Sequence, residues 1–350
     1  MNFALFLPNW VGDLVMATPT LRALRRHFGR STRIVGILRP NLAELLAGTD
    51  WLDEQWYFAP RRFRFDLGRW ALVARMRRMR PDMALLLTNS LHTAALAWLG
   101  GAKDRIGYVR DARGPLLTGK LYPLRDGRRP RPVPMVDYYL ALARAAGCPP
   151  ESPRLELAVT EAEHQRGERI WKTLGLRTDG RVVAINSSGA YGAAKLWPIE
   201  HCGTLARQIV AQLDCDVLLL CGPRERQAAL DAVRHAGSPR VFTLPEDAVG
   251  LSSTKACLER SRLLVSTDSG PRHIAAALGK PVITLLGPTL PTWIENPTVS
   301  GRMLRAEVDC LGCGRRICPL EHHGCMRNLG PEQVFREVAA MVDAPAVKAA

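Results

Sequence analysis

The chain has 350 residues, which is long enough for two domains that each bury a core of their own. Lys and Arg outnumber Asp and Glu by 48 to 33, a formal net charge of +15. No run approaches the roughly 20 apolar residues that span a bilayer, and the short apolar start lacks the basic residues of a signal peptide. We therefore expect a cytoplasmic protein.

The excess positive charge lies almost entirely in the first half. Residues 1–150 carry 24 basic and 11 acidic side chains, a net of +13, whereas residues 151–350 carry 24 and 22, a net of +2. Arg61, Arg62 and Arg64 begin the densest run, which continues to Arg80. A basic face attracts nucleic acid, anionic lipid headgroups or a polyanionic substrate, or is merely solvated. No nucleic-acid signature is present, so we expect no nucleic-acid partner.

Short apolar runs alternate with helical patterns through residues 1–146. Strands are expected at 3–7, 33–38, 83–87 and 105–108, and helices at 14–28, 67–79, 91–99 and 135–146. Runs that are apolar on both faces predict a parallel sheet covered by helices on each side. The polar, Pro-rich stretch 125–134 is expected to lack regular structure.

A second alternation follows the breaker-rich stretch 147–153. Strands are expected at 155–159, 182–186, 217–221, 241–244, 263–265 and 282–286, and helices at 161–174, 198–212, 224–235, 251–260, 274–278 and 331–342. Two successive doubly wound units predict an α/β protein with two Rossmann-like domains, residues 1–150 and 151–350, facing a central cleft. The last helix could pack back on the first domain.

The first strand is followed by Asn9, Gly12 and Asp13, with a helix expected from Leu14. Ligands of open α/β sheets bind beyond the carboxyl ends of the strands. Asp13 is therefore either an ordinary helix N-cap or a general base aimed into the cleft. Pro19, inside the helical pattern, predicts a bend.

A loop with two hydroxyls, two glycines and one lysine follows the strand at 182–186. It contains Ser187, Ser188 and Lys195, and it lacks the Walker A spacing. Backbone N–H groups and hydroxyls can bind diphosphate oxygens while the ammonium neutralises their charge. The alternative is a flexible loop with a surface lysine.

A strand–turn–helix unit carries the sequence STDSGPRH from Ser266 to His273. The N-terminus of its helix can hold a phosphate, because its N–H groups are unpaired and the dipole is positive there. Ser269 is suited to the N-cap, and Gly270 lets a ligand approach the backbone. The alternative is an ordinary capped helix.

Four of the nine cysteines form a cluster near the end of the chain: Cys310, Cys313, Cys318 and Cys325. Four cysteines can make a tetrahedral zinc site, although only the first pair has the CxxC spacing of a standard zinc ribbon. An Fe–S centre, reduced thiols and disulfides remain as alternatives. The cluster lies outside the other motifs, so we expect no catalytic role for it.

Gly12-Asp13, the SSGAYGAAKLWP loop and the TDSGPRH turn together resemble the ADP-heptose:lipopolysaccharide heptosyltransferases, most of all the heptosyltransferase II branch. The resemblance runs from about residue 3 to 334. It implies a GT-B fold, with the acceptor bound by residues 1–150 and the donor by residues 151–350. It also implies inverting, metal-independent transfer of a heptose from ADP-heptose to the inner core of lipopolysaccharide, at the cytoplasmic face of the inner membrane.

By this resemblance Asp13 corresponds to the catalytic base. Donor contacts are implied at Ser187, Ser188, Lys195, Gly222, Glu225, Asp268, Ser269, Gly270 and His273. Arg113 lies where the family places a basic acceptor contact, and charge and position add Asn9, Arg61, Arg62 and Arg64. One departure is that the family loop often starts Gly-Ala-Glu, whereas this chain has Ser188-Gly189-Ala190. No cofactor is implied beyond the donor substrate.

Three other functions remain open on the sequence: transfer of another sugar or to another acceptor, nucleotide-sugar epimerisation, and non-catalytic binding. An epimerase needs several acids and histidines together, and only Asp13, Asp268 and His273 are clearly placed. Glycosyl transfer needs one base and stabilisation of the departing diphosphate. A second carboxylate is unnecessary because ADP leaves as an anion.

Overall fold

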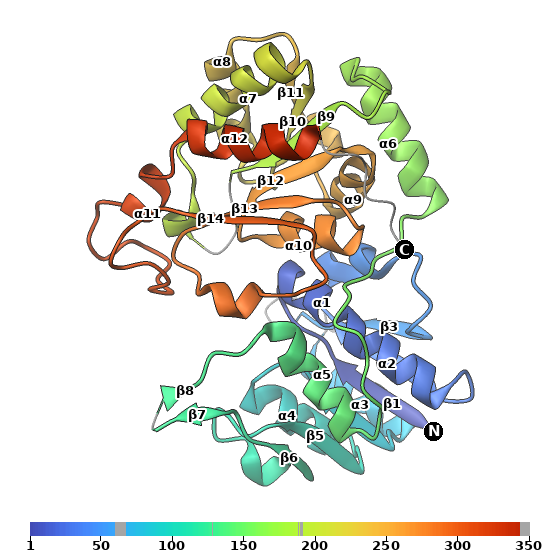
Figure 1. Cartoon of the computed structure of the whole chain (residues 1–350). Coiled ribbons are helices and arrows are strands. Elements are labelled where there is room, and N and C mark those ends of the chain that lie inside the picture. The colour runs from blue at the N-terminus through green and yellow to red at the C-terminus, as the bar shows by residue number, and fades with distance from the viewer. Residues whose placement is uncertain (60–67, 128, 188, 190–191, 344–350) are drawn as a thin grey trace. The chain divides into compact units, whose positions relative to one another are not determined.

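The computed structural model of the chain describes residues 1–59, 68–127, 129–187, 189 and 192–343 (Figure 1). It divides into unit 1, Met1–Leu155 with Thr292–Asn296, and unit 2, Glu156–Pro291 with the chain from Pro297 onward. The boundary that we predict between residues 150 and 151 thus lies a few residues early. The sequence did not predict that Thr292–Asn296 returns to unit 1, where the Asn296 Nδ2 donates to the Pro153 carbonyl at 2.8 Å.

Unit 1 is a six-stranded parallel sheet with helices on both faces. The strand order is β3-β2-β1-β4-β5-β6, formed by β1 (Asn2–Phe6), β2 (Arg33–Leu38), β3 (Glu54–Tyr57), β4 (Met83–Leu86), β5 (Asp104–Tyr108) and β6 (Gly119–Leu121). One face carries α1 (Val11–Met16), α2 (Thr18–Phe28) and α5 (Met135–Ala145), and the other carries α3 (Arg69–Met79) and α4 (Leu91–Leu99). A short antiparallel pair, β7 (Arg125–Asp126) and β8 (Arg129–Pro130), interrupts the stretch that we expected to lack regular structure.

The single helix predicted at 14–28 is two helices that break at Ala17. Pro19 lies in the first turn of α2. Backbone N–H groups there have no partner within the helix, so the N–H that proline lacks costs no hydrogen bond. The helix α1 begins earlier than predicted, and its N-cap residue is Trp10. Asp13 is therefore inside the first turn of α1, and the interpretation of Asp13 as an N-cap is wrong.

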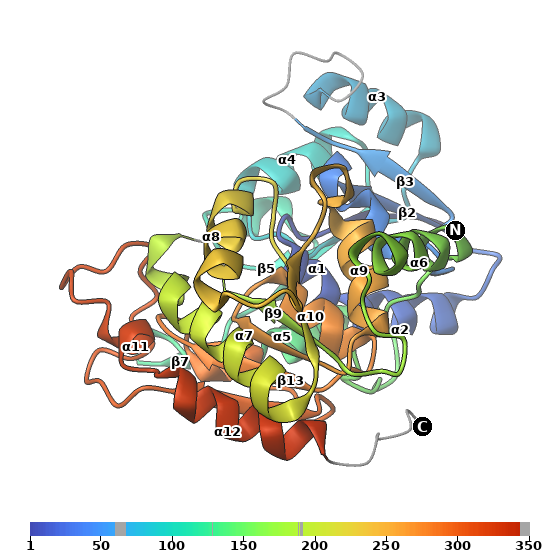
Figure 2. The same ribbon diagram turned by 90° about the horizontal axis from the view of Figure 1, so that it is seen from above.

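Unit 2 repeats the architecture of unit 1. Its parallel sheet has the order β11-β10-β9-β12-β13-β14, formed by β9 (Val182–Asn186), β10 (Asp216–Leu219), β11 (Val241–Thr243), β12 (Leu263–Thr267), β13 (Val282–Leu286) and β14 (Gly301–Arg305). One face carries α7 (Ile199–Leu213), α8 (Arg226–Ala236) and α12 (Pro331–Val342), and the other carries α6 (Glu161–Leu174), α9 (Leu251–Arg260) and α10 (Gly270–Ala277). In Figure 2, α7 lies between α8 and α12. A short helix, α11 (Gly324–Arg327), contacts β13.

Short 3-10 helices occur in both units. They are η1 (Pro40–Leu46), η3 (Gly114–Leu116), η4 (Ala193–Lys195), η5 (Glu246–Ala248) and η6 (Pro291–Ile294). Among the described residues, the segment predicted as a strand at 155–159 pairs with no other strand. Its alternating pattern arises because Leu155 and Leu157 are both buried, where the chain passes from unit 1 to unit 2.

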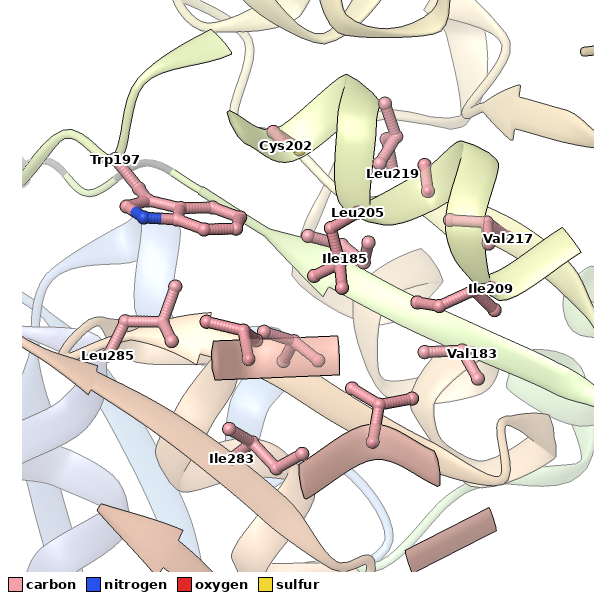
Figure 3. Packing of buried hydrophobic residues seen from close by; sticks show 14 of the residues in the cluster. Val183, Ile185, Trp197, Cys202, Leu205, Ile209, Val217, Leu219, Ile283 and Leu285 are labelled. Atoms are coloured by element: carbon pink, nitrogen blue, oxygen red, sulfur yellow. The ribbon is translucent and has the colours of Figure 1, made fainter. Parts of the chain in front are cut away.

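The core of unit 2 lies between the sheet and α7. Side chains from β9 and β10, such as Ile185 and Leu219, face Leu205 and Ile209 of α7 (Figure 3). Fully burying a side chain of this kind stabilises the fold by about 1.5–3 kcal/mol. The helix α12 adds Val334, Val338 and Val342 to the same core, with the spacing of one helical face. The last helix is thus part of unit 2 and not, as we allowed from its sequence, of the first domain.

Both sheets have the strand order of the Rossmann fold, which confirms the predicted α/β class with two Rossmann-like units. In such sheets ligands bind where the strand order reverses, outside the carboxyl ends of the strands. That point lies between β1 and β4 in unit 1 and between β9 and β12 in unit 2. Among the residues described, no helix is long and apolar enough to cross a lipid bilayer.

Candidate active site

Asp13 lies at the strand-order reversal of unit 1, where α1 leaves the end of β1. One of its carboxylate oxygens, Oδ1, accepts a hydrogen bond from the Tyr139 hydroxyl of α5 at 3.1 Å. Asp13 is half-buried and Tyr139 is buried. The carboxylate is therefore oriented by a side chain from another helix, beside the edge at which α/β sheets bind ligands.

Tyr139 acts as a hydrogen-bond donor at any physiological pH. Burial, and next the negative charge of Asp13, raise the pKa of Tyr139 well above its usual value. The phenol therefore keeps its proton. A neutral donor at one oxygen favours the ionised form of Asp13, which is the form that a general base needs. The sequence did not indicate Tyr139, because nothing local connects it to a carboxylate 126 residues away.

The other predicted residues of unit 1 have different outcomes. Asn9 is exposed in the loop after β1, and its contact with the acceptor stays a prediction. Arg61, Arg62 and Arg64 lie outside the described residues.

Arg113 is a correction to the predicted acceptor site. Its side chain is 0 % exposed, so it offers no surface to a large acceptor. The Arg113 Nε donates to the Tyr108 carbonyl at 2.8 Å, Nη2 donates to Asn89 Oδ1 at 2.9 Å, and Nη1 donates to the Thr88 carbonyl. These partners follow β4 and end β5, so Arg113 braces the carboxyl edge of the unit 1 sheet from inside.

In unit 2, the loop after β9 and the turn after β12 meet in an ion pair. The Lys195 Nζ lies 2.6 Å from Asp268 Oδ2 and 2.9 Å from the Asp268 carbonyl oxygen. The same carboxylate oxygen accepts a hydrogen bond from Thr289 Oγ1 at 2.7 Å. Lys195 is thus held beside the start of α10 and is not the loose surface lysine of the alternative interpretation.

His273 contacts the other oxygen of Asp268, with its Nε2 3.5 Å from Oδ1. The Arg272 guanidinium donates to His273 Nδ1 at 3.2 Å, so the ring proton belongs on Nε2 and points at Asp268. Burial, and next the charge of Arg272, lower the pKa of His273 to about 4. At neutral pH the contact with Asp268 is therefore a hydrogen bond from a neutral ring.

Asp268 is almost fully buried and remains ionised. Burial alone would raise its pKa, but the hydrogen bond from His273 and the charge of Lys195 together hold the pKa well below its usual value. A carboxylate this acidic and this fully hydrogen-bonded is a poor proton acceptor. Asp268 therefore positions Lys195 and His273 and is poorly suited to act as a base itself.

Hydroxyl groups connect the ends of β9 and β12. The Asn186 Nδ2 donates to Ser269 Oγ at 2.9 Å, and the Ser269 and Ser266 hydroxyls are 3.1 Å apart. Ser269 occupies the N-cap position of α10, as predicted, but its side chain makes no capping bond. Gly189 packs here as well, since a Cβ on it would lie 3.2 Å from Ser269 Cβ. Ser188 lies outside the described residues.

Gly222 and Glu225 form a separate turn after β10. The Gly222 N–H donates to Glu225 Oε2 at 2.8 Å, and Glu225 is the N-cap residue of α8. Glu225 and Ser187 line a common cavity of about 10 Å³. The structure thus brings Lys195, Asp268, Ser269 and His273 into one cluster at the start of α10, and it places Gly222 and Glu225 at the neighbouring strand end.

The cluster at the start of α10 suits an anionic ligand. It combines an ammonium, several hydroxyls and the N-terminus of an eight-residue helix that begins at Gly270. In the described part of the chain, no three His, Cys, Asp or Glu side chains are grouped so that they would hold a metal ion as they stand.

Comparison with known proteins identifies a family, a similar relative and two similar solved structures. The model of glycosyltransferase family 9 (heptosyltransferase) matches residues 69–323. Lipooligosaccharide heptosyltransferase 2 of Haemophilus influenzae is 26% identical over 303 residues, which cover 84% of this chain and 85% of the relative. Among solved structures, a family 9 glycosyl transferase of Veillonella parvula has a TM-score of 0.80 at 20% identity and covers 97% of this chain and 96% of its own.

The ADP-heptose lipopolysaccharide heptosyltransferase II of Escherichia coli has a TM-score of 0.78 at 23% identity, with 98% of both chains covered. Because the family model matches well over half of the chain, the protein belongs to glycosyltransferase family 9, the heptosyltransferases.

Proposed function

We propose that the protein transfers a heptose from ADP-heptose to the inner core of lipopolysaccharide, as a heptosyltransferase II-like enzyme. The names of its relatives support this donor and acceptor. The observation that carries the proposal is the cluster of Lys195, Asp268 and His273 at the N-terminus of α10, where the strand order of unit 2 reverses.

The donor diphosphate is proposed to bind at the start of α10. The N–H groups of the first turn and the Lys195 ammonium supply positive charge there, and the hydroxyls of Ser187 and Ser269 supply further hydrogen bonds. Asp268 keeps the ammonium at this position before the donor arrives. As the glycosidic bond breaks, charge builds on the diphosphate, so preorganised cations stabilise the transition state.

Asp13 is proposed to act as the general base. Its carboxylate takes the proton of the acceptor hydroxyl while the acceptor oxygen forms a bond to the anomeric carbon of the heptose. The bond from that carbon to the diphosphate oxygen breaks, and ADP leaves with the electron pair as an anion. Attack opposite the leaving group inverts the anomeric configuration. This chemistry needs one carboxylate base, unlike the paired carboxylates of glycosidases.

The enzyme is proposed to work as a peripheral protein at the cytoplasmic face of the inner membrane. Its acceptor is anchored there by lipid, and unit 1 carries most of the positive charge of the chain. In the described part of unit 1, α3 carries the exposed side chains of Arg69, Arg78 and Trp70, the last of which is 75 % exposed. Basic and aromatic side chains of this kind favour an anionic membrane surface.

The test is mass spectrometry of defined truncated lipopolysaccharides incubated with the protein and ADP-heptose. We expect one truncation to gain the mass of one heptose, and Asp13→Asn to abolish the gain. If the protein binds ADP-heptose but modifies none of the truncations, the proposed acceptor is wrong. If calorimetry detects no binding of ADP-heptose, the proposed donor is wrong.

A further inference from the structure

The segment between β14 and α11, residues 306–323, runs for 18 residues without a helix or strand. Loops of this length are uncommon in compact domains and usually serve a function. The large apolar side chains Ile317 and Leu320 are exposed, so the tip of the segment does not pack on an apolar core of its own. Glu321 and His323 adopt left-handed backbone conformations, with φ of 55° and 48°, which cost energy in residues other than glycine. Apolar burial therefore holds the start of the segment, where Val308 and Leu311 pack against the core of unit 2, but not its tip.

The four clustered cysteines surround a small internal space. A cavity of about 30 Å³ is lined by Cys310, Cys313, Cys318 and Cys325, together with His323 and Ala194. A tetrahedral zinc–thiolate site has Zn–S bonds of about 2.3 Å, so its sulfurs are only about 3.8 Å apart. As they stand, the four thiols do not converge to such a site, so metal binding requires their side chains to move. Three of the four cysteines lie outside helices and strands.

His322 is arranged to support a thiolate. The Gly324 N–H donates to His322 Nδ1 at 2.7 Å, which places the ring proton on Nε2. That Nε2 lies 4.0 Å from the Cys310 Sγ. An N–H group directed at a sulfur is the kind of outer-shell partner that stabilises metal-bound cysteines.

The same segment holds the turn that carries Lys195. The Ala194 N–H donates to the Arg316 carbonyl at 3.0 Å. A Cβ on Gly192 would lie 2.4 Å from that carbonyl oxygen, so only glycine permits this approach. Ala194 also lines the thiol cavity. A residue that lines the cavity, Ala194, is therefore the direct neighbour of Lys195 in the chain.

We propose that the four cysteines bind one thiophilic transition-metal ion, zinc or iron, and that this ion fixes the turn at 192–195. Tetrahedral sulfur sites select these two metals. Binding releases the thiol protons to solvent and replaces them by metal–sulfur bonds. The ion would thereby preorganise Lys195 for the donor diphosphate, a part of the inference that rests on the proposed function.

Metal content tests the site independently of transferase activity. We expect protein purified under reducing conditions to contain about one zinc or iron per chain by elemental analysis. An iron–thiolate site absorbs visible light and a zinc site does not, so the spectrum separates the two metals. Cys313→Ser and Cys318→Ser should each lose the ion, whereas Cys148→Ala, in unit 1, should keep it. His322→Ala should weaken metal affinity about 10–100-fold.

Two results would overturn the site. One is a reduced wild-type protein that holds no ion and takes up neither Zn²⁺ nor Co²⁺. The other is serine variants that bind metal as the wild type does, which would mean that the ion lies elsewhere. Because the wild-type chain is used for the uptake measurement, a serine variant that fails to fold does not obscure the answer.

Limited trypsinolysis tests the ordering of the segment. Arg315 and Arg316 are exposed between the second and third cysteines. Removing the metal with a chelator should speed cleavage after these arginines at least about tenfold, because local opening becomes easier. Equal cleavage rates would refute the ordering role. Calorimetry should show weaker ADP binding after chelation. If neither the metal-bound nor the chelated protein binds ADP, the proposed donor site is wrong, but the metal site is not thereby excluded.

Discussion

Asp13 and Tyr139 are the residues of unit 1 on which the proposed chemistry depends. We expect Asp13→Asn to lower kcat by about 10²–10⁴-fold, the usual contribution of a general base. Asp137→Asn is the matched control, since that exposed carboxylate opens the helix that carries Tyr139. Steady-state kinetics with calorimetry of ADP binding checks the prediction. A loss below tenfold would reduce Asp13 to a structural role.

Tyr139→Phe should change the pH profile more than the fold. Removing the donor from the Asp13 carboxylate favours its protonated form, so the acidic limb of the kcat/KM profile should move up by about one pH unit. Tyr138→Phe is the control, because that neighbouring buried phenol donates to Asn89 Oδ1. An unmoved acidic limb in Tyr139→Phe would show that the hydrogen bond does not tune the base.

Lys195→Ala should weaken ADP-heptose binding by about 10–100-fold, the loss expected for one charge-assisted hydrogen bond. Lys172→Ala removes an exposed lysine from the last turn of α6 and should bind the donor normally. Calorimetry with both variants decides the matter. Equal affinities would mean that Lys195 serves only to neutralise Asp268.

At the scale of elements, the start of α10 should make stability sensitive to acid. The pKa of His273 is about 4 in the folded chain, below the ordinary 6.5, so the unfolded chain binds the proton more readily between these values. Stability should therefore fall as the pH drops from 6.5 toward 4, by about 2.5 kcal/mol from this group at pH 4.5. Urea unfolding at pH 7 and 4.5 measures the loss. His273→Gln should lose less over that range, and an equal loss would exclude His273 as the cause.

The strands that carry the site were predictable, and the contacts within it were only partly so. Apolar runs marked β1, β9 and β12, because buried parallel strands are apolar on both faces. The short edge strands β3, β6 and β14 went unpredicted, because their residues are mixed in polarity and nearly all half-buried or exposed. Local pattern selected Lys195 and Asp268 but not their ion pair, which joins positions 73 residues apart.

For Arg113 the sequence predicted a surface contact that the structure does not show. A basic residue in a polar loop suggests a surface contact, yet this guanidinium is the brace of a buried turn. An arginine can be buried only where carbonyl groups accept its hydrogen bonds. Those carbonyl groups come together only in the folded sheet, so a local sequence pattern does not predict the burial.

At the scale of the whole molecule, the uneven charge predicts binding to anionic membranes. Arg69→Glu with Arg78→Glu should weaken sedimentation with anionic vesicles by at least about 30-fold in low salt. The loss of each basic residue removes about 1 kcal/mol, and the two added acidic charges are repelled as well; salt screens both effects. Arg166→Glu with Arg169→Glu makes the same change on the exposed side of α6 in unit 2 and should have little effect. Equal binding by both double variants would mean that α3 does not face the membrane.

The return of Thr292–Asn296 to unit 1 has a consequence for synthesis on the ribosome. The first 155 residues emerge together, but the piece that bonds to Pro153 through Asn296 follows only after most of unit 2. At 5–20 residues per second, that delay is roughly 7–28 s. Unit 1 must therefore persist incomplete for many times the folding time of an ordinary small domain, and it is open to chaperones and proteases throughout that delay.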